Sequence, residues 1–250
     1  MAGLRIRRGF SSSTGIACTF GIVFLVIVGL LLGAAIQSAR QAAFSNCCDC
    51  HLKQLGIALQ NYHDTHKVFP PAFIADADGK PMHSWRVLLL PYLEEQELYK
   101  RYRFDEPWDS PHNRKLADEI NVTQFRCPAA NGPANETSYV VVCDPETLFP
   151  GYHGRSIRDV RDGTSKTISI VEVANSGIHW MEPRDLTLDE ALAGINPPNR
   201  SPAISSSHSG GAMVGWADAH VSFLPNDLAI DKLRALLTAS GGESVSEPGN

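Results

Sequence analysis

Hydrophobic and polar positions are sharply separated near the start of the chain. No charged residue occurs between Gly9 and Ala39, and residues 16–36 form an almost unbroken apolar run. A helix of this length covers roughly 30 Å, the thickness of a bilayer's hydrocarbon core, and satisfies its own backbone hydrogen bonds there. The pattern therefore predicts a transmembrane helix over residues 16–36.

The charges that flank this helix predict its orientation. Arg5, Arg7 and Arg8 precede the apolar run, and positively charged flanks stay in the cytoplasm. We therefore expect residues 1–15 to form a cytoplasmic N-terminus and residues 37–240 to form an extracytoplasmic domain. The expected location is the inner (cytoplasmic) membrane, which the chain crosses once.

Two alternatives for the apolar run are disfavoured. A cleaved secretory signal would have a shorter apolar core, followed by a cleavage site of small residues. A lipid-modified cysteine follows its apolar stretch, whereas Cys18 precedes most of the run. We therefore expect the run to remain as a membrane anchor.

A second helical pattern follows the apolar run. Leu52, Leu55, Leu59 and Tyr62 recur at spacings of three and four with polar residues between them, which is typical of an amphipathic helix. Because no proline occurs between residues 37 and 69, the membrane helix is expected to continue as one rod to about Asp64. The sequence thus predicts a long, pilin-like N-terminal helix.

Short β-branched segments occupy the middle of the chain. Residues 137–143 and 167–173 predict strands, and Asp162-Gly163 marks the turn before the second of them. We expect these segments to pair in one sheet.

A hairpin and a helix are predicted near the C-terminus. Residues 212–217 and 220–224 read as two strands, and a helix capped by Asp227 follows over residues 228–237. The polar residues 241–250 predict a flexible tail. Because the hairpin is local and helices follow strands, we expect an α+β head with a mainly antiparallel sheet.

Charge excludes one class of partner. The chain carries 22 Lys and Arg against 27 Asp and Glu, and all of the acidic residues follow residue 40. An acidic extracytoplasmic part repels phosphate backbones, so nucleic acid is excluded as a partner.

Cysteines predict a covalent link within the head. Cys47, Cys48 and Cys50 cluster just after the apolar run, and Cys127 and Cys143 follow far along the chain. In an oxidising compartment such cysteines form disulfides. Cys127 could join its segment to the N-terminal helix through Cys48 or a neighbour, and the connectivity stays open.

The cysteine cluster also contains a haem-attachment pattern. Cys47, Cys50 and His51 satisfy C-x-x-C-H, in which two thiols anchor haem and the histidine ligates iron. The match is short, and Cys48 makes the assignment of the thiols ambiguous. We expect no cofactor and keep a membrane-anchored c-type cytochrome as an alternative.

The chain lacks the motifs of common enzymes. Ser206 or Ser207, His208 and Asp218 are the residue types of a hydrolytic triad, but neither G-x-S-x-G nor H-E-x-x-H nor a P-loop is present. We therefore expect no enzyme. His208 is expected to hydrogen-bond the hairpin backbone, and Asp218 is expected in its turn.

A polar and aromatic cluster is the candidate binding surface. It is equally compatible with a buried ion pair beside a packed tryptophan. Its members are His179, Trp180, Glu182, Arg184 and Asp185. A metal- or solute-binding head would be a third possible function, with His179, Glu182, His208 and Asp218 as its ligands.

Several motifs follow one another at wide separations along the chain. They are Leu52–Asp64, Phe69-Pro70-Pro71, Ser84-Trp85-Arg86, Leu90–Glu94 and Asp162–Ser165. Together they resemble the planctomycete membrane proteins of domain-of-unknown-function family 1559, a family that also carries a solute-binding label. The resemblance runs from about Arg8 to Ser240. A closing signature of His, nine residues and Asp-Gly matches His208 and Asp218, with Ala219 in place of Gly.

The resemblance implies a prepilin-like leader and partners of a matching kind. Family members are cut after the glycine of an Arg-Gly-Phe motif, which appears here as Arg8-Gly9-Phe10. The acidic residue that pairs with a neighbouring pilin is replaced by Thr14, so we expect residues 1–9 to be retained. The implied function is a structural or interaction protein whose partners are pilin-like subunits or other cell-envelope proteins.

Overall fold

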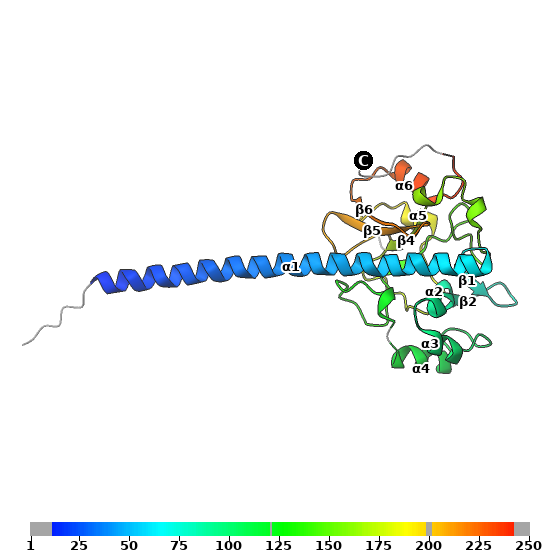
Figure 1. The fold of residues 1–250 in the computed structure, drawn as a ribbon, viewed down its shortest axis with the longest axis horizontal. Helices are drawn as coiled ribbons and strands as arrows, with labels where there is room; N and C mark the ends of the chain where they lie inside the picture. The colour runs from blue at the N-terminus through cyan, green and yellow to red at the C-terminus, as the bar shows by residue number, and fades with distance from the viewer. Residues whose placement is uncertain (1–11, 121, 199–201, 243–250) are drawn as a thin grey trace, which may run out of the picture. The chain divides into compact units, whose positions relative to one another are not determined.

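The computed structural model describes residues 12–120, 122–198 and 202–242, and within the first helix it describes no side chains for residues 12–26, 34, 38 and 40–46. The chain divides into two compact units, Met1–Ala43 and Phe44–Asn250. The α-helices are α1 Ser12–His66, α2 Trp85–Leu89, α3 Gln96–Arg101, α4 Pro111–Glu119, α5 Leu188–Ala191 and α6 Ile230–Leu237. The strands are β1 Phe73–Ala75, β2 Pro81–Ser84, β3 Tyr139–Val140, β4 Ile168–Glu172, β5 Gly211–Trp216 and β6 Val221–Pro225 (Figure 1).

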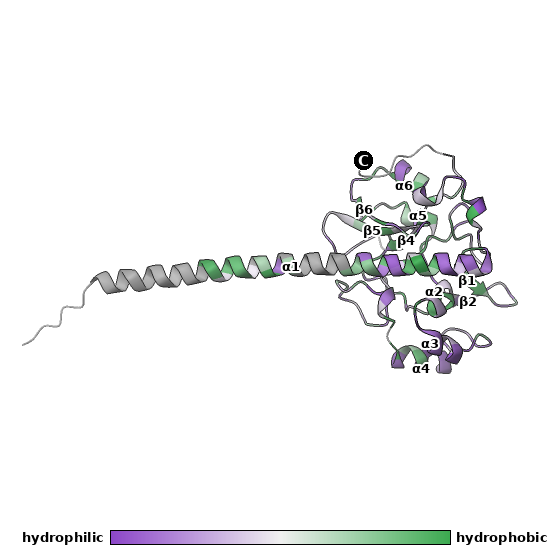
Figure 2. Ribbon diagram, in the orientation of Figure 1, coloured by the Kyte–Doolittle hydropathy of each residue, from purple (hydrophilic) through white to green (hydrophobic). Residues whose placement is uncertain are grey.

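The first unit is helical and rich in exposed apolar side chains. Large aliphatic side chains of α1 that are 49% to 69% exposed include Ile27, Leu30, Leu31, Leu32 and Ile36, and Figure 2 colours this stretch as hydrophobic. Among the described residues, none of the helices combines the length and hydropathy that a bilayer crossing needs. Residues 16–26 of the expected transmembrane helix lie outside the residues whose side chains are described.

The second unit is built around the C-terminal part of α1. Leu52, Leu55 and Leu59 lie on one face of the helix and are buried, as their spacing predicts. The predicted continuous helix is confirmed, since α1 runs without a break to His66. Lys67 then takes a positive φ of 65° and the chain turns away, three residues before Pro70.

A four-stranded antiparallel sheet in the order β3-β4-β5-β6 covers this helix. Alternate residues face opposite ways, so that Tyr139 and Ile170 join the core beneath α1. Val140 and Val171 join a second core with the apolar residues of α5 and α6. Both faces of β4 are thus buried, whereas the edge strand β6 keeps partly exposed and exposed residues. The expected α+β class and antiparallel sheet are confirmed.

Two predicted boundaries differ from the structure. Only Tyr139 and Val140 of the expected strand 137–143 form a regular strand, because Val142 and Cys143 leave the sheet and bridge to other segments. The C-terminal helix begins after Ala229, not Asp227, since Asp227 lies within a turn closed by the Leu228 N–H and the Pro225 carbonyl.

The remaining elements of the second unit are short. A two-stranded antiparallel sheet pairs β1 with β2. Four 3-10 helices connect other elements of the described residues, and the first of them, η1, has Pro91 in its first turn. Their bounds are η1 Leu90–Tyr92, η2 Thr123–Phe125, η3 Ile157–Asp159 and η4 Thr164–Lys166.

The hairpin turn between β5 and β6 rests directly on α1. A Cβ atom added at Gly56 would lie 2.9 Å from the Ala219 Cα, so only glycine lets the helix approach the turn this closely. The Gln60 side chain donates a hydrogen bond to the Ala217 carbonyl at the same place. Ala219 has a φ of 71°, a left-handed conformation that would suit the glycine of the family signature better than alanine.

Replacing Ala219 with Gly is expected to raise the free energy of unfolding by about 1 kcal/mol, because a left-handed conformation costs an L-residue roughly that much. Chemical denaturation of the purified full-length chain would measure the change. Ala77→Gly is the control, since Ala77 is exposed and has no positive φ, and there the added flexibility should lower stability. A loss of stability in both variants would contradict the strain argument.

Candidate functional site

A disulfide joins α1 to the segment that follows η2. Cys48 and Cys127 are bonded across a sequence separation of 79, with their Cα atoms 5.2 Å apart. Both residues are buried. This confirms the predicted link from Cys127 to the N-terminal helix and identifies Cys48 as the partner of Cys127. Among the described residues, Cys47, Cys50 and Cys143 are free.

The imidazole of His208 lies against this disulfide. Its Nε2 atom is 3.3 Å from the Cys48 Sγ and 3.6 Å from the Cys127 Sγ. The loop before β5 fixes the residue, because the His208 N–H donates to the Ser206 Oγ at 3.0 Å. Burial lowers the pKa of His208. The ring thus faces sulfur, whereas the sequence suggested that it bonds the hairpin backbone.

A buried carboxylate completes this cluster. Glu172, the last residue of β4, is only 1% exposed. The Met213 N–H donates to its Oε2 atom at 3.3 Å, and burial raises the pKa of Glu172 to about 7 against a hydrogen bond from Ser206. One ligand atom from each of Cys48, Cys127, Glu172 and His208 lies within 4.8 Å of the others. We call these four residues the sulfur cluster.

The sulfur cluster was only partly visible in the sequence. Cys48, Cys127 and His208 each stood out by residue type, but nothing local links positions so far apart. Glu172 lies within the predicted strand 167–173, between Val171 and Val173, and no role was expected for it. A charged residue within an apolar, β-branched segment was the signal that could have identified it.

The residues of the haem-attachment pattern lie beside this cluster on α1. Cys47 is partly buried and Cys50 is exposed. The Nδ1 atom of His51 is 2.9 Å from the Arg126 carbonyl oxygen, and its Nε2 atom is 3.9 Å from the Cys47 Sγ. We still expect no haem at these residues, and covalent attachment stays an alternative that the structure does not test.

The signature aspartates have separate local partners. Asp218 lies in the turn of the β5–β6 hairpin, where its Oδ1 atom is 2.6 Å from the His220 Nδ1. Asp162 accepts hydrogen bonds from the N–H groups of Gly241 and Gly242 at 2.7 Å and 2.8 Å, and Gly163 follows it with a φ of 94°. The first two residues of the expected tail are therefore tethered, and residues 243–250 lie outside the described residues.

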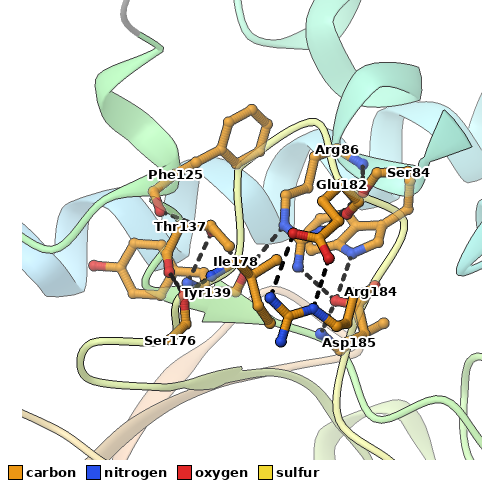
Figure 3. Close-up of polar contacts among 12 residues, drawn as sticks. Ser84, Arg86, Phe125, Thr137, Tyr139, Ser176, Ile178, Glu182, Arg184 and Asp185 are labelled. Carbon is orange, nitrogen blue, oxygen red and sulfur yellow. Dashed lines mark hydrogen bonds and ion pairs between the residues drawn. The ribbon is translucent and has the colours of Figure 1, made fainter. Parts of the chain in front are cut away.

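A second polar cluster surrounds a buried ion pair. Arg86 and Asp185 meet at 2.5 Å between Nη2 and Oδ1, and their side chains are 0% and 3% exposed. Asp185 also accepts from the Trp85 indole at 3.1 Å and from the Val141 N–H at 3.0 Å. The guanidinium donates to the Tyr139 carbonyl at 3.1 Å. Figure 3 shows Arg86, Tyr139 and Asp185 among the polar contacts of this cluster.

The remaining residues of the expected binding surface lie at different depths. Trp180 is buried and stacks on Phe125 with their centroids 5.6 Å apart. Glu182 and Arg184 form an ion pair at 2.7 Å near the surface, visible in Figure 3. Asp185 therefore pairs with Arg86, which is 99 positions away, and not with its neighbour Arg184.

His179 is buried next to this cluster. Its ring lies 5.4 Å from that of Trp108, and its Nδ1 atom accepts from the Met181 N–H at 3.1 Å. Burial lowers the pKa of His179 to about 4, helped by the charge of Arg114 and opposed by Glu182 and Asp118. The ring is consequently neutral near pH 7.

This neutral ring predicts a loss of stability in acid. Between pH 6.5 and pH 4 the unfolded chain binds a proton that folded His179 does not, so the free energy of unfolding should fall by about 3 kcal/mol as the pH drops through this window. His179→Asn should remove this part of the loss, because the amide oxygen can replace Nδ1 as the acceptor. Denaturant titrations at pH 7 and pH 4 measure the difference.

The exposed His153 supplies the control for this prediction. His153→Asn should leave the pH dependence of unfolding as it is in the wild type. An equal loss in wild type and His179→Asn would show that other groups carry the acid sensitivity.

The other proposed ligand and catalytic sets are dispersed. His208 faces sulfur atoms, Asp218 faces His220, and the His179 N–H donates to Glu182 at 3.2 Å. In the described part of the chain, the sulfur cluster is the one group of metal-ligating side chains with converging ligand atoms. The sulfur cluster therefore brings together two sulfur atoms, which are bonded to each other, an imidazole nitrogen and a carboxylate oxygen at a mostly buried position.

Comparison with known proteins identifies a family of unknown function. Residues 37–153 match the family model SBP_bac_10, described as a protein of unknown function (DUF1559). This confirms the resemblance that the motifs indicated, over a shorter stretch than residues 8–240, and the His208 and Asp218 signature lies beyond it. No curated protein and no solved structure matches the chain.

Proposed function

We propose that this DUF1559-family chain is a membrane-anchored, extracytoplasmic structural or interaction protein with pilin-like or pseudopilin-like architecture. The observation that carries the proposal is the dual use of α1. One part of the helix is apolar and exposed, and another part forms the centre of an α+β head. A pilin or pseudopilin uses its N-terminal helix in the same two ways.

The exposed apolar part of α1 supports the membrane anchor. Aliphatic side chains as exposed as Leu30 and Leu31 are unfavourable in water, and a bilayer would cover them. The absence of charge between Gly9 and Ala39 permits the same segment to enter hydrocarbon. Three arginines before residue 9 favour an N-terminus in the cytoplasm.

The disulfide supports an extracytoplasmic head. Structural disulfides form and persist outside the cytosol, and the Cys48–Cys127 bond closes a long loop within the head. The head is acidic and its sequence has none of the common catalytic motifs named above, which favours contact with other envelope proteins over catalysis. Thr14 replaces the acidic residue of a pilin leader, so we propose that residues 1–9 are kept and that partners are bound through the head.

Membrane extraction and protease protection test this proposal. The wild type should stay in carbonate-washed membranes, and protease added to intact spheroplasts should remove its head. Leu30→Arg combined with Leu31→Arg should release the chain, because each arginine at the centre of a membrane helix costs about 2.5–3.5 kcal/mol.

Ile57→Arg provides the matched control on the same helix. Ile57 is an exposed aliphatic residue within the head, so its replacement by arginine should leave the chain in the membrane. A wild-type chain that carbonate removes, or a head that protease cannot reach, would overturn the proposal.

One observation favours testing a second function, that of a membrane-anchored c-type cytochrome. Cys47 and Cys50 are free while Cys48 is bonded to Cys127, so both thiols of the C-x-x-C-H pattern remain for thioether formation. Expression in a host with haem-attachment machinery decides between the two. A Soret band that disappears in Cys50→Ser would identify a c-type cytochrome, and we expect none.

A further inference from the structure

We propose that the sulfur cluster is a redox-gated site for a divalent cation of the zinc type. Reduction of the Cys48–Cys127 bond would supply two thiolates, with the His208 imidazole and the Glu172 carboxylate as the other ligands. The juxtaposition of one ligand atom from each of these four residues within 4.8 Å carries the proposal. The site is independent of the membrane anchor and of the proposed function.

Distances in the cluster suit a tetrahedral centre. Zinc lies about 2.3 Å from sulfur and about 2.0 Å from nitrogen or oxygen, which places the ligand atoms of a tetrahedron roughly 3.3–3.8 Å apart. The Nε2 atom of His208 is already 3.3 Å from one sulfur and 3.6 Å from the other. Once the bond is broken, rotation about the Cα–Cβ bonds lets the two sulfur atoms separate, and the Glu172 ligand atom starts within 4.8 Å of the other three.

The buried carboxylate independently points to a cation. Glu172 is almost completely inaccessible, and no Lys or Arg pairs with it among the described residues. Its partners are instead the Met213 N–H and the Ser206 hydroxyl. An ionised carboxylate in such a place is unfavourable unless a positive charge neutralises it. A divalent cation bound directly to a Glu172 oxygen would place a positive charge next to this carboxylate.

The protein also supplies the outer contacts that orient metal ligands. Ser206 holds the His208 backbone, and the Met213 N–H holds a Glu172 oxygen. The four ligands come from α1, from the segment after η2, from β4 and from the loop before β5. A bound cation would therefore join the two segments that the disulfide joins and also β4 and the loop before β5, and the cation and the disulfide are alternatives.

The chemistry of the switch balances with one external reductant. A dithiol of the thioredoxin type reduces the Cys48–Cys127 bond to two thiols and is itself oxidised to a disulfide. Metal binding then converts the two thiols to thiolates and releases two protons to solvent. Oxidation of the thiolates by a disulfide reverses the process, rebuilding the bond and expelling the cation.

Cobalt titration of the full-length chain in detergent tests the proposal. Cys18, Cys47, Cys50 and Cys143 are first replaced by serine, so that Cys48 and Cys127 are the remaining thiols. The chain is reduced with dithiothreitol, freed of it without oxygen, and titrated with Co²⁺. We expect one Co²⁺ per chain, near-ultraviolet thiolate charge-transfer bands, the visible bands of a tetrahedral site and displacement by Zn²⁺. The oxidised chain should give none of these signals.

Variants establish which side chains bind. Glu172→Gln and His208→Ala should each weaken binding at least 10-fold, since even outer contacts of a metal site are worth 10–100-fold. His51→Ala is the control, because His51 lies one turn from Cys48 on α1 and outside the cluster. It should leave the affinity unchanged.

Two results would overturn the proposal. One is a Co²⁺ spectrum that neither Glu172→Gln nor His208→Ala alters. The other is a reduced chain whose far-ultraviolet circular dichroism shows unfolding that Zn²⁺ does not reverse. Retention of helix content by both variants shows that their weaker binding does not come from failure to fold.

Discussion

Asp185→Ala is expected to lower the free energy of unfolding by about 3–5 kcal/mol, the cost of stranding one charge of a buried pair. Arg86 is fully buried, and Asp185 is its only ion-pair partner in the described residues. The substitution also leaves the Trp85 indole and the Val141 N–H without an acceptor. Equilibrium unfolding of the purified chain in denaturant measures the loss.

The neighbouring pair Glu182 and Arg184 supplies a matched control. It has a similar separation of 2.7 Å but lies near the surface, so Arg184→Ala should cost less than about 1 kcal/mol. A double variant, Arg86→Met with Asp185→Leu, replaces the ion pair with apolar side chains and should recover part of the stability lost in Asp185→Ala. Equal losses in Asp185→Ala and Arg184→Ala would contradict the role of burial.

Features encoded locally could be predicted from the sequence. The continuous helix followed from the spacing of Leu52, Leu55 and Leu59 together with the absence of proline, because helical periodicity depends on neighbours within one turn or two. The β5–β6 hairpin followed for a similar reason. The positive φ of Ala219, which stands where the family signature has glycine, became evident only in the structure.

Features that depend on distant partners could not be predicted. The strand expected over residues 137–143 is short because Val142 pairs with Leu186 and Cys143 with Phe149, outside the sheet. The role of Gly56 follows only from the approach of the hairpin turn to α1. Neither of these contacts can be inferred from the residues that neighbour them in the sequence.

The candidate site divides in the same way. The polar cluster over residues 179–185 was identified by its residue types, but Arg86, the partner of Asp185, was noted only as part of the motif Ser84-Trp85-Arg86. Glu172 was missed because burial of a strand on both faces depends on what packs against it. His208 was singled out, yet its proximity to two sulfur atoms follows from a loop that begins far from α1.

Removing the disulfide should have the second large effect on stability. In the double variant Cys48→Ala with Cys127→Ala, the free energy of unfolding is expected to fall by about 4–5 kcal/mol, the loop entropy that a cross-link over 79 residues removes from the unfolded chain. The same two segments also lose buried sulfur atoms that pack beneath the sheet. Denaturation of both chains under oxidising conditions measures this loss of stability. A metal chelator is added so that no bound metal contributes to it.

The free cysteines of the same helix provide the control for this variant. Cys47→Ser with Cys50→Ser removes two thiols from α1 and leaves the Cys48–Cys127 bond intact, so stability should change by less than about 1 kcal/mol. Dithiothreitol should destabilise this control as much as it destabilises the wild type, and should leave the Cys48→Ala, Cys127→Ala variant unaffected. If the reductant weakened that variant equally, a different disulfide would be holding the head together.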